Sequence, residues 1–263
     1  MVVGPMTLHV RSVRNARLTT CNYGLSRVAF RGPRRPTDGA YVACIGSSET
    51  FARNVTQPFP NLLEDRTGTV CINLGQQMAG PDLFLQDEAV RALIHDASAM
   101  VLQVMGAANL SNRFYKVHPR RNDRFIAPKP ALRQLYPDVD FTDVAFTGHL
   151  LTKLVEKDPV RFSQVRAVLQ RSWIRRMRQL VGLAKGPVHL LWFAPRDPRS
   201  PAVDGHDPNL VTPKMLGALE EAGAKLTTVI YQGRPGALPQ SPDADDHRRV
   251  ASALSKAMGR GLK

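Results

Sequence analysis

Five short apolar runs recur along the chain at wide spacing, and this pattern constrains the fold more than any other feature of the sequence. The runs are YVACI (41–45), TVCINL (69–74), AMVLQVM (99–105), PVHLLWFA (187–194) and KLTTVIY (225–231). Each is rich in Val, Ile and Leu without clean alternation, which is typical of strands that are buried on both faces. We therefore interpret all five as strands of one buried sheet.

Helices are predicted between and after these strands, at about 59–65, 83–96, 143–157, 160–184, 212–222 and 246–258. Strands that alternate with helices pair in parallel through right-handed crossovers. The predicted fold class is therefore α/β: a three-layer sandwich with a five-stranded parallel sheet, over residues 41–263. Residues 106–142 form a long polar insertion without clear periodicity, and loops of that length are usually functional or disordered.

The residues before the first strand, 1–40, contain the basic, turn-prone stretches RSVRNAR and RGPRRPTDG. We predict a basic N-terminal extension that packs over the domain. The whole chain is also basic, with a formal net charge of +14, which predicts attraction to anions. Because the sequence has neither a zinc-finger spacing nor an aromatic RNA-binding motif, we expect an anionic small molecule or saccharide as the substrate, and no nucleic acid.

Composition also indicates in which cellular compartment the protein is expected. No window holds eighteen uninterrupted apolar residues, so a membrane span is not expected, and the first residues do not read as a secretory signal. The three cysteines, Cys21, Cys44 and Cys71, are scattered without a C-x-x-C spacing. This pattern argues against a disulfide scaffold or a zinc site and favours a reducing cytoplasm. We expect no metal and no organic cofactor.

Polar segments follow each of the five strands, and in an open parallel sheet ligands bind at the carboxyl ends of the strands. The segments are GSSET, GQQMAGPD, GAANLSNRFYKVHPRRNDRF, APRDPRSPAVDGHD and QGRPGALPQSPDADDH. Each segment alone is a weak signal. Their convergence on one edge of the sheet predicts a functional site there.

These segments resemble the four blocks of the SGNH (GDSL-like) hydrolases, enzymes with a flavodoxin-like α/β fold, and the match runs in order over most of the chain. By this resemblance Ser48 of GSSETF is the nucleophile and its own N–H helps to form the oxyanion hole. NLGQQMAGPD resembles the block whose glycine donates a second N–H, and Asn109 of GAANLSN matches the asparagine donor. DADDHRRVASAL resembles the last block, which gives His247 as the base. The chain, particularly SNRFYKVHPRRNDRF, also resembles an alphaproteobacterial family of unknown function.

The residue types suit ester chemistry. A serine hydroxyl becomes a good nucleophile when an imidazole within hydrogen-bond reach accepts its proton, and preset donors stabilise the oxyanion. A carboxylate beside His247 would fix the tautomer of the ring. The resemblance expects this acid three residues before the histidine, where the chain has Ala244, so either Asp243 or Asp245 substitutes or a Ser–His dyad operates.

The oxyanion block also departs from the pattern, because the glycine expected five residues after Asn73 is Met78. Gly75, Gly80 or the backbone of Met78 could then supply the N–H. Other readings stay open: Ser48 could be a turn residue or a helix N-cap, and Asn109 could serve a turn. Among the other histidines, His206 in VDGHDP is a lesser rival for the base.

Two basic stretches complete the prediction. VHPRRNDRF (117–125) leaves the third strand, and we expect His118, Arg120, Arg121, Asn122 and Arg124 to clamp an anionic group of the substrate. The predicted helix at 160–184 carries six arginines off an apolar stripe of Phe162, Val165, Leu169, Trp173, Met177 and Leu180. Its basic face is either solvated or a docking surface.

The predicted function is a serine esterase or acyl-transfer enzyme acting on an anionic, saccharide-linked ester. The alternative is a catalytically silent module that binds an anionic glycan or nucleotide.

Overall fold

The computed structural model describes residues 18–200, 210–232 and 241–259. Its central sheet has the order β4-β3-β5-β8-β9, and every neighbouring pair is parallel. The strands are β3 (Tyr41–Ile45), β4 (Val70–Asn73), β5 (Ala99–Gln103), β8 (Val188–Ala194) and β9 (Lys225–Ile230). All five predicted runs form strands, and the predicted fold class is confirmed.

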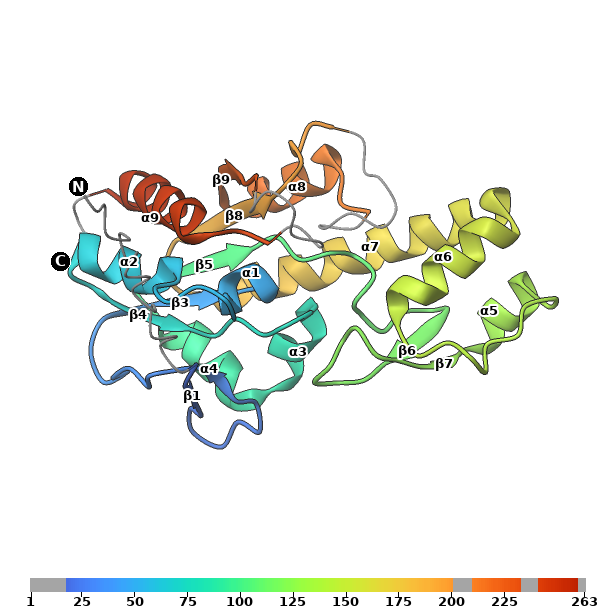
Figure 1. The fold of residues 1–263 in the computed structure, drawn as a ribbon, viewed down its shortest axis with the longest axis horizontal. Coiled ribbons are helices and arrows are strands. Elements are labelled where there is room, and N and C mark those ends of the chain that lie inside the picture. Colours follow the sequence, from blue (N-terminus) through green and yellow to red (C-terminus); the bar gives the residue numbers. More distant parts are fainter. Residues whose placement is uncertain (1–17, 201–209, 233–240, 260–263) are drawn as a thin grey trace, which may run out of the picture.

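Helices cover both faces of this sheet (Figure 1). The helices α2 (Phe59–Thr67) and α9 (Ala244–Met258) pack on one face. The other face is covered by α3 (Pro81–Gln86), α4 (Glu88–Asp96), α7 (Pro159–Leu183) and α8 (Pro213–Glu220). Alternate strand residues enter the two cores, as Val42 and Ala43 show. Burial on both faces explains why the strand sequences do not alternate between apolar and polar residues.

One predicted helix differs from the structure, and a short helix was not predicted. The helix expected at 83–96 is split into α3 and α4 at Asp87, which has an extended backbone and accepts a hydrogen bond from Val90 N–H at 3.1 Å. Asp87 therefore caps a new helix. The single-turn helix α1 (Ser48–Phe51) has no counterpart among the predicted helices, because four residues are too few for a periodic pattern.

The long helix α7 follows its predicted pattern. All six residues of the apolar stripe are buried. With partners among the described residues, three of its arginines form ion pairs: Arg161 with Asp138 and Asp158, Arg176 with Asp82, and Arg178 with Glu221. The basic face is thus partly neutralised by acids from other segments.

The insertion without periodicity is folded. It contains an antiparallel pair, β6 (Tyr115–Val117) and β7 (Phe125–Pro128), followed by α5 (Pro130–Leu135). With α6 (Thr147–Lys157) these elements form a lobe at the right of Figure 1, beside one end of α7. Short elements stabilised by tertiary contacts leave little periodicity in the sequence.

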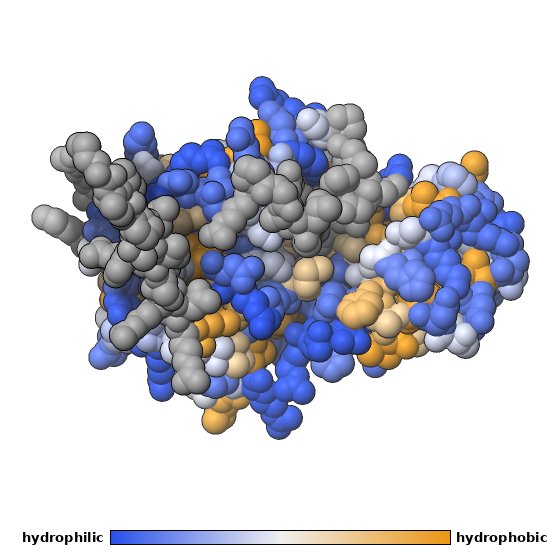
Figure 2. Space-filling model, in the orientation of Figure 1, coloured by the Kyte–Doolittle hydropathy of each residue, from blue (hydrophilic) through white to orange (hydrophobic). Residues whose placement is uncertain are grey.

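The described part of the N-terminal segment packs against the sheet domain. It contains β1 (Thr20–Cys21) and β2 (Phe30–Arg31), which pair antiparallel, and it buries Tyr23 and Phe30. The face seen in Figure 2 is mostly hydrophilic with scattered apolar groups. Within the described ranges, no helix has the length and apolar character needed to cross a bilayer.

Candidate functional site

The site lies where the chain leaves the carboxyl end of β3. This strand sits between β4 and β5, so the order of the strands reverses around it, and ligands bind at such switch points in open α/β sheets. Gly46 follows directly after β3, and a Cβ atom there would overlap the side chains of Thr50 and Gln103. A glycine therefore lets the chain turn tightly from the strand into α1.

Gln103, the last residue of β5, fixes this turn. Its Oε1 accepts hydrogen bonds from Ser47 N–H at 2.9 Å, Thr50 N–H at 3.2 Å and the Thr50 hydroxyl at 2.5 Å. Its Nε2 donates to the Glu49 carboxylate at 2.6 Å. Because three donors meet one oxygen, the orientation of the amide is set by its contacts. Gln103 was not among the residues predicted from the sequence, since it falls within an apolar strand run.

Ser48 contacts the loop that follows β4. Its Oγ accepts a hydrogen bond from Met78 N–H at 3.0 Å, and the Met78 carbonyl in turn accepts one from Asn109 Nδ2 at 3.1 Å. The first residue of α1, the second polar segment and the third polar segment thus meet. Ser47, rather than Ser48, is the N-cap of α1, and its side chain makes no capping bond.

The two glycines predicted as oxyanion donors are used elsewhere. Gly75 N–H donates to Asn73 Oδ1 at 3.0 Å, and Gly80 N–H donates to Asn122 Oδ1 at 2.9 Å. Both N–H groups therefore have acceptors within the protein, and their role as oxyanion donors stays a prediction. Met78 itself has a φ of 55°, in the left-handed region that glycine usually occupies.

Gly80 is required for a different reason. A Cβ atom at Gly80 would overlap the Asn109 carbonyl oxygen, so the second and third segments touch backbone to backbone. We expect Gly80→Ala to lower the free energy of unfolding by about 1–3 kcal/mol, measured by urea denaturation. Gly217→Ala is the matched control, because nothing lies near its Cβ and alanine favours the helix α8. Equal stability of the two variants would contradict this close approach.

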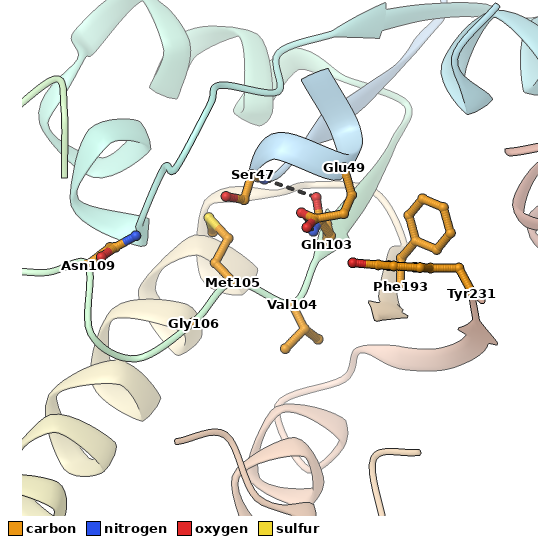
Figure 3. Close-up of a pocket in the computed structure, with 9 residues that line it drawn as sticks. All are labelled: Ser47, Glu49, Gln103, Val104, Met105, Gly106, Asn109, Phe193 and Tyr231. Carbon is orange, nitrogen blue, oxygen red and sulfur yellow. Dashed lines mark hydrogen bonds between the residues drawn. The ribbon is translucent and has the colours of Figure 1, made fainter. Parts of the chain in front are cut away.

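A hollow beside Ser47 collects further polar groups (Figure 3). Glu49, Gln103 and Asn109 line it together with the rings of Phe193 and Tyr231. Asn109 is held from the other side by Thr147, whose hydroxyl donates to Asn109 Oδ1 at 2.6 Å. This bond leaves Nδ2 of Asn109 facing Met78. Thr147 begins α6, more than thirty residues after Asn109, so the sequence offered no local signal for it.

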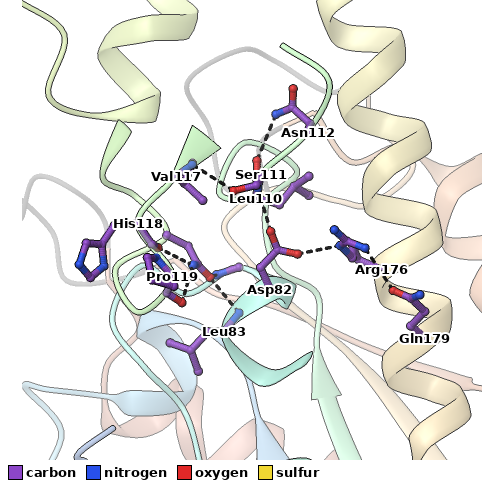
Figure 4. A network of polar contacts seen from close by, with 12 residues as sticks. Asp82, Leu83, Leu110, Ser111, Asn112, Val117, His118, Pro119, Arg176 and Gln179 are labelled. Carbon is purple, nitrogen blue, oxygen red and sulfur yellow. Dashed lines mark hydrogen bonds and ion pairs between the residues drawn. The ribbon is translucent and has the colours of Figure 1, made fainter. Parts of the chain in front are cut away.

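A buried carboxylate joins the same loops to α7 (Figure 4). Asp82 accepts from Ser111 N–H at 2.8 Å and from Arg176 Nε at 2.7 Å. Its side chain is only 2% exposed, so both bonds are shielded from water. The network ties α3, which follows the second segment, to the third segment.

The predicted anion clamp at 117–125 is only partly available to a ligand. Asn122 is fully buried and accepts hydrogen bonds from Gly80 N–H and Leu83 N–H, so it holds the start of α3 and cannot contact a substrate. His118 Nδ1 accepts from the N–H groups of Arg120 and Arg121, both at 3.2 Å, and stabilises the turn.

The three arginines of this loop differ. Arg124 lies over the ring of Phe146, 4.4 Å from its centroid. Arg120 and Arg121 are exposed. Of the predicted clamp, Arg120 and Arg121 are therefore the side chains that remain accessible to an anion.

His247 lies in the core under α9. The side chain is fully buried between Phe59, on which it stacks, and Phe193, which it meets edge-on. Its Nδ1 accepts a hydrogen bond from Phe59 N–H at 3.1 Å, so the proton of the neutral ring is on Nε2. Nε2 is buried and has no hydrogen-bond partner among the described residues. Among the described residues His247 and Ser48 share no hydrogen bond, and the role of His247 as the base stays a prediction.

Both aspartates predicted to support His247 form contacts within the first turn of α9, and the charge of Asp243 also acts on the ring, where it raises the pKa. Asp243 is the N-cap of α9, and its side chain accepts hydrogen bonds from the N–H groups of Asp245 and Asp246. The Asp246 side chain accepts in return from the Asp243 N–H, which completes a capping box. Asp245 forms an ion pair with Arg248. DADDH is therefore the first turn of a helix, whose side chains point in different directions. The D-x-x-D spacing is the sequence signal of this cap.

Burial lowers the pKa of His247 to about 3, and the nearby Arg31 cation adds to this effect. Because the unfolded state binds a proton near pH 6.5 and the folded state does not, stability falls as the pH drops from about 6.5 toward 3. We expect His247→Gln to remove this pH dependence of the free energy of unfolding, whose slope is at most about 1.4 kcal/mol per pH unit. Urea unfolding between pH 7 and 4 measures it, and parallel curves for the two proteins would contradict it.

Within the described residues, no cluster of three or more His, Cys, Asp or Glu side chains is arranged to hold a metal ion. Cys44 and Cys71 are buried free thiols on neighbouring strands, and burial raises the pKa of Cys44. His206 lies outside the described residues. The groups that meet at the site are thus hydroxyls, amides, the Glu49 carboxylate and backbone N–H groups.

Comparison with solved structures gives several matches of low sequence identity. LAE5, an alpha/beta hydrolase enzyme from the metagenome of Lake Arreo, Spain, is 14% identical over 84% of this chain and 96% of its own, with a TM-score of 0.49. An acetyl-xylooligosaccharide esterase from Geobacillus Stearmophilus is 13% identical over 85% and 96% of the two chains, with a TM-score of 0.45. A carbohydrate esterase family 2 enzyme of Corynascus thermopiles is 12% identical over 88% and 68%, with a TM-score of 0.44.

Sequence identities this low do not indicate which reaction a chain carries out. No curated protein matches the sequence at a significant level. A family model described as "Domain of unknown function (DUF6473)" matches residues 6–261, and the chain belongs to this family.

Proposed function

We propose that the protein is a serine esterase of SGNH type in which Ser48 is the nucleophile. The observation that carries the proposal is the hydrogen bond from Met78 N–H to Ser48 Oγ, at 3.0 Å, beside the amide of Asn109. An alcohol and candidate oxyanion donors therefore lie in contact. Acyl transfer needs this pairing, whereas a turn residue or a helix cap does not.

The reaction would proceed through an acyl-enzyme. The Ser48 hydroxyl attacks the ester carbonyl carbon, its proton passes to a base, and the carbonyl oxygen becomes an oxyanion. Met78 N–H, Ser48 N–H and Asn109 Nδ2 would donate to that oxygen, each typically worth about 3–4 kcal/mol of barrier. Collapse expels the alcohol with the proton, and water then releases the acid from Ser48.

Ser48 shares no hydrogen bond with a histidine among the described residues, so the identity of the base is a separate proposal. His247 carries its ring proton on Nε2 inside the core. We propose His206, the second candidate from the sequence, as the base. Replacing His206 with alanine should then lower ester turnover about a hundredfold or more, while His247→Gln changes stability and little else. The opposite result would return the role to His247.

The substrate is proposed to be an ester with an anionic, saccharide-linked portion outside the hollow. Arg120 and Arg121 are exposed on the loop near the hollow, and guanidinium groups suit the recognition of an anion. Asn122 of that loop bonds to Gly80, two residues from Met78. A charged group is therefore expected at the loop and a neutral acyl group beside Ser48.

A binding module without catalysis is the second candidate, and the burial of His247 is the observation that favours it. A fluorophosphonate probe separates the two functions. The esterase predicts covalent labelling that maps to Ser48 by peptide mass spectrometry and disappears in Ser48→Ala. A protein that binds the probe's acidic products without labelling would be a binding module.

Thr147 provides a further test, because its hydroxyl fixes the amide orientation of Asn109. Thr147→Val keeps the shape of the side chain but removes the hydroxyl donor. We therefore expect kcat to fall about tenfold with KM little changed, which is a smaller effect than the loss of one whole oxyanion donor. Thr147→Ser should restore kcat. Steady-state kinetics on both variants measures this, and a loss in KM alone would contradict the positioning role.

A further inference from the structure

A second cavity lies away from Ser48, between α5 and α7. It is open to solvent and has a volume of about 530 Å³, within the range of about 300–1,000 Å³ that small-ligand pockets occupy. Its floor is apolar and is formed by Phe114, Ala131, Leu135, Ala167 and Val168. It shares no lining residue with the hollow beside Ser47.

The rim of this cavity carries charge of one sign. Arg113, from the segment before β6, and Arg171, from α7, line it together with Gln134 and Gln164, and no carboxylate does. Arg113 and Arg171 have no hydrogen bond or ion pair with any residue that the structure describes. This distinguishes Arg171 from Arg161 and Arg176 of the same helix, which are paired with aspartates.

We propose that this cavity binds a single-chain anionic amphiphile, with a carboxylate or phosphate head between Arg113 and Arg171. The apolar floor would hold the aliphatic tail, and the two glutamine amides can bond to remaining head-group oxygens. Guanidinium groups without a carboxylate partner suit such a head group. A helical peptide fits less well, because α5 has six residues and so forms a wall only about 9 Å long.

The experiment measures binding of monomeric dodecyl phosphate to the full chain by isothermal titration calorimetry. Inorganic phosphate and dodecanol are run in parallel, and both should bind at least about tenfold more weakly, because each lacks half of the contacts. Arg113→Gln and Arg171→Gln should each weaken binding of dodecyl phosphate about tenfold. Ala167→Phe, which fills the floor without changing charge, should abolish it.

Arg175→Gln is the matched control, since Arg175 is exposed on α7 but does not line the cavity. Its affinity should stay within about twofold. The proposal is overturned if Arg175→Gln weakens binding as much as Arg171→Gln, if inorganic phosphate binds equally well, or if Ala167→Phe has no effect. Salt-sensitive binding to anionic phospholipid vesicles that Ala167→Phe leaves unchanged would identify a membrane surface as the partner and would also overturn it.

Discussion

Replacing Ser48 with alanine is expected to lower the turnover of a small ester such as p-nitrophenyl acetate about a thousandfold or more. Ser48 Oγ is in hydrogen-bond contact with Met78 N–H, so the proposed attacking atom and a proposed oxyanion donor are adjacent before substrate arrives. Alanine removes the attacking oxygen and keeps the backbone N–H of residue 48. The rate should therefore fall while substrate binding persists.

Ser47→Ala is the matched control for this variant. Ser47 is the neighbouring serine and lines the hollow. It donates to Gln103 through its backbone N–H, which alanine retains. We expect its turnover to stay within a few-fold of the unaltered protein. A collapse of activity in Ser47→Ala with normal activity in Ser48→Ala would move the nucleophile by one residue. Normal activity in both would remove ester chemistry from this turn.

Replacing Arg31 with methionine is expected to lower the free energy of unfolding by about 3–5 kcal/mol, because several buried carbonyls lose their donor together. The guanidinium donates to the carbonyls of Phe51 and Ala52 at the end of α1, and to Val55 at 2.6 Å and Thr56 at 3.3 Å. Methionine fills much of the same space but donates nothing. The end of the helix that carries Ser48 should then loosen.

Urea unfolding at pH 7 measures this loss, with Arg27→Met as the control. Arg27 belongs to the same N-terminal segment but is exposed, so its replacement should change stability by no more than about 0.5 kcal/mol. Arg31→Lys should recover part of the loss, since an ammonium reaches fewer carbonyls. Equal stability of the Arg27 and Arg31 variants would show that the carbonyls find other donors.

Much of the fold could be predicted because it depends on patterns that repeat within short windows. The five strands were found as apolar runs, and their burial on both faces required helices in two layers. The stripe from Phe162 to Leu180 fixed which side of α7 is buried. Gly46 marked the turn at the end of β3, where the site begins.

The site was predicted less well, because its geometry depends on contacts between distant residues. Ser48 contacts the second segment through Met78 N–H, whereas the N–H groups of Gly75 and Gly80 donate to Asn73 and Asn122. Thr147 holds Asn109 across an insertion that showed no periodicity. No local pattern encodes such a bond.

The sequence by itself determined the layered sheet and the edge at which polar segments gather, since hydrophobic burial follows the period of each element. Only the tertiary structure decided which polar groups meet at that edge. DADDH reads equally as an acid beside a histidine or as a helix cap, and packing of α9 on Phe59 and Phe193 turned His247 into the core. The direction of a side chain is set by the rotation of its helix against the sheet, which depends on residues far away in the chain.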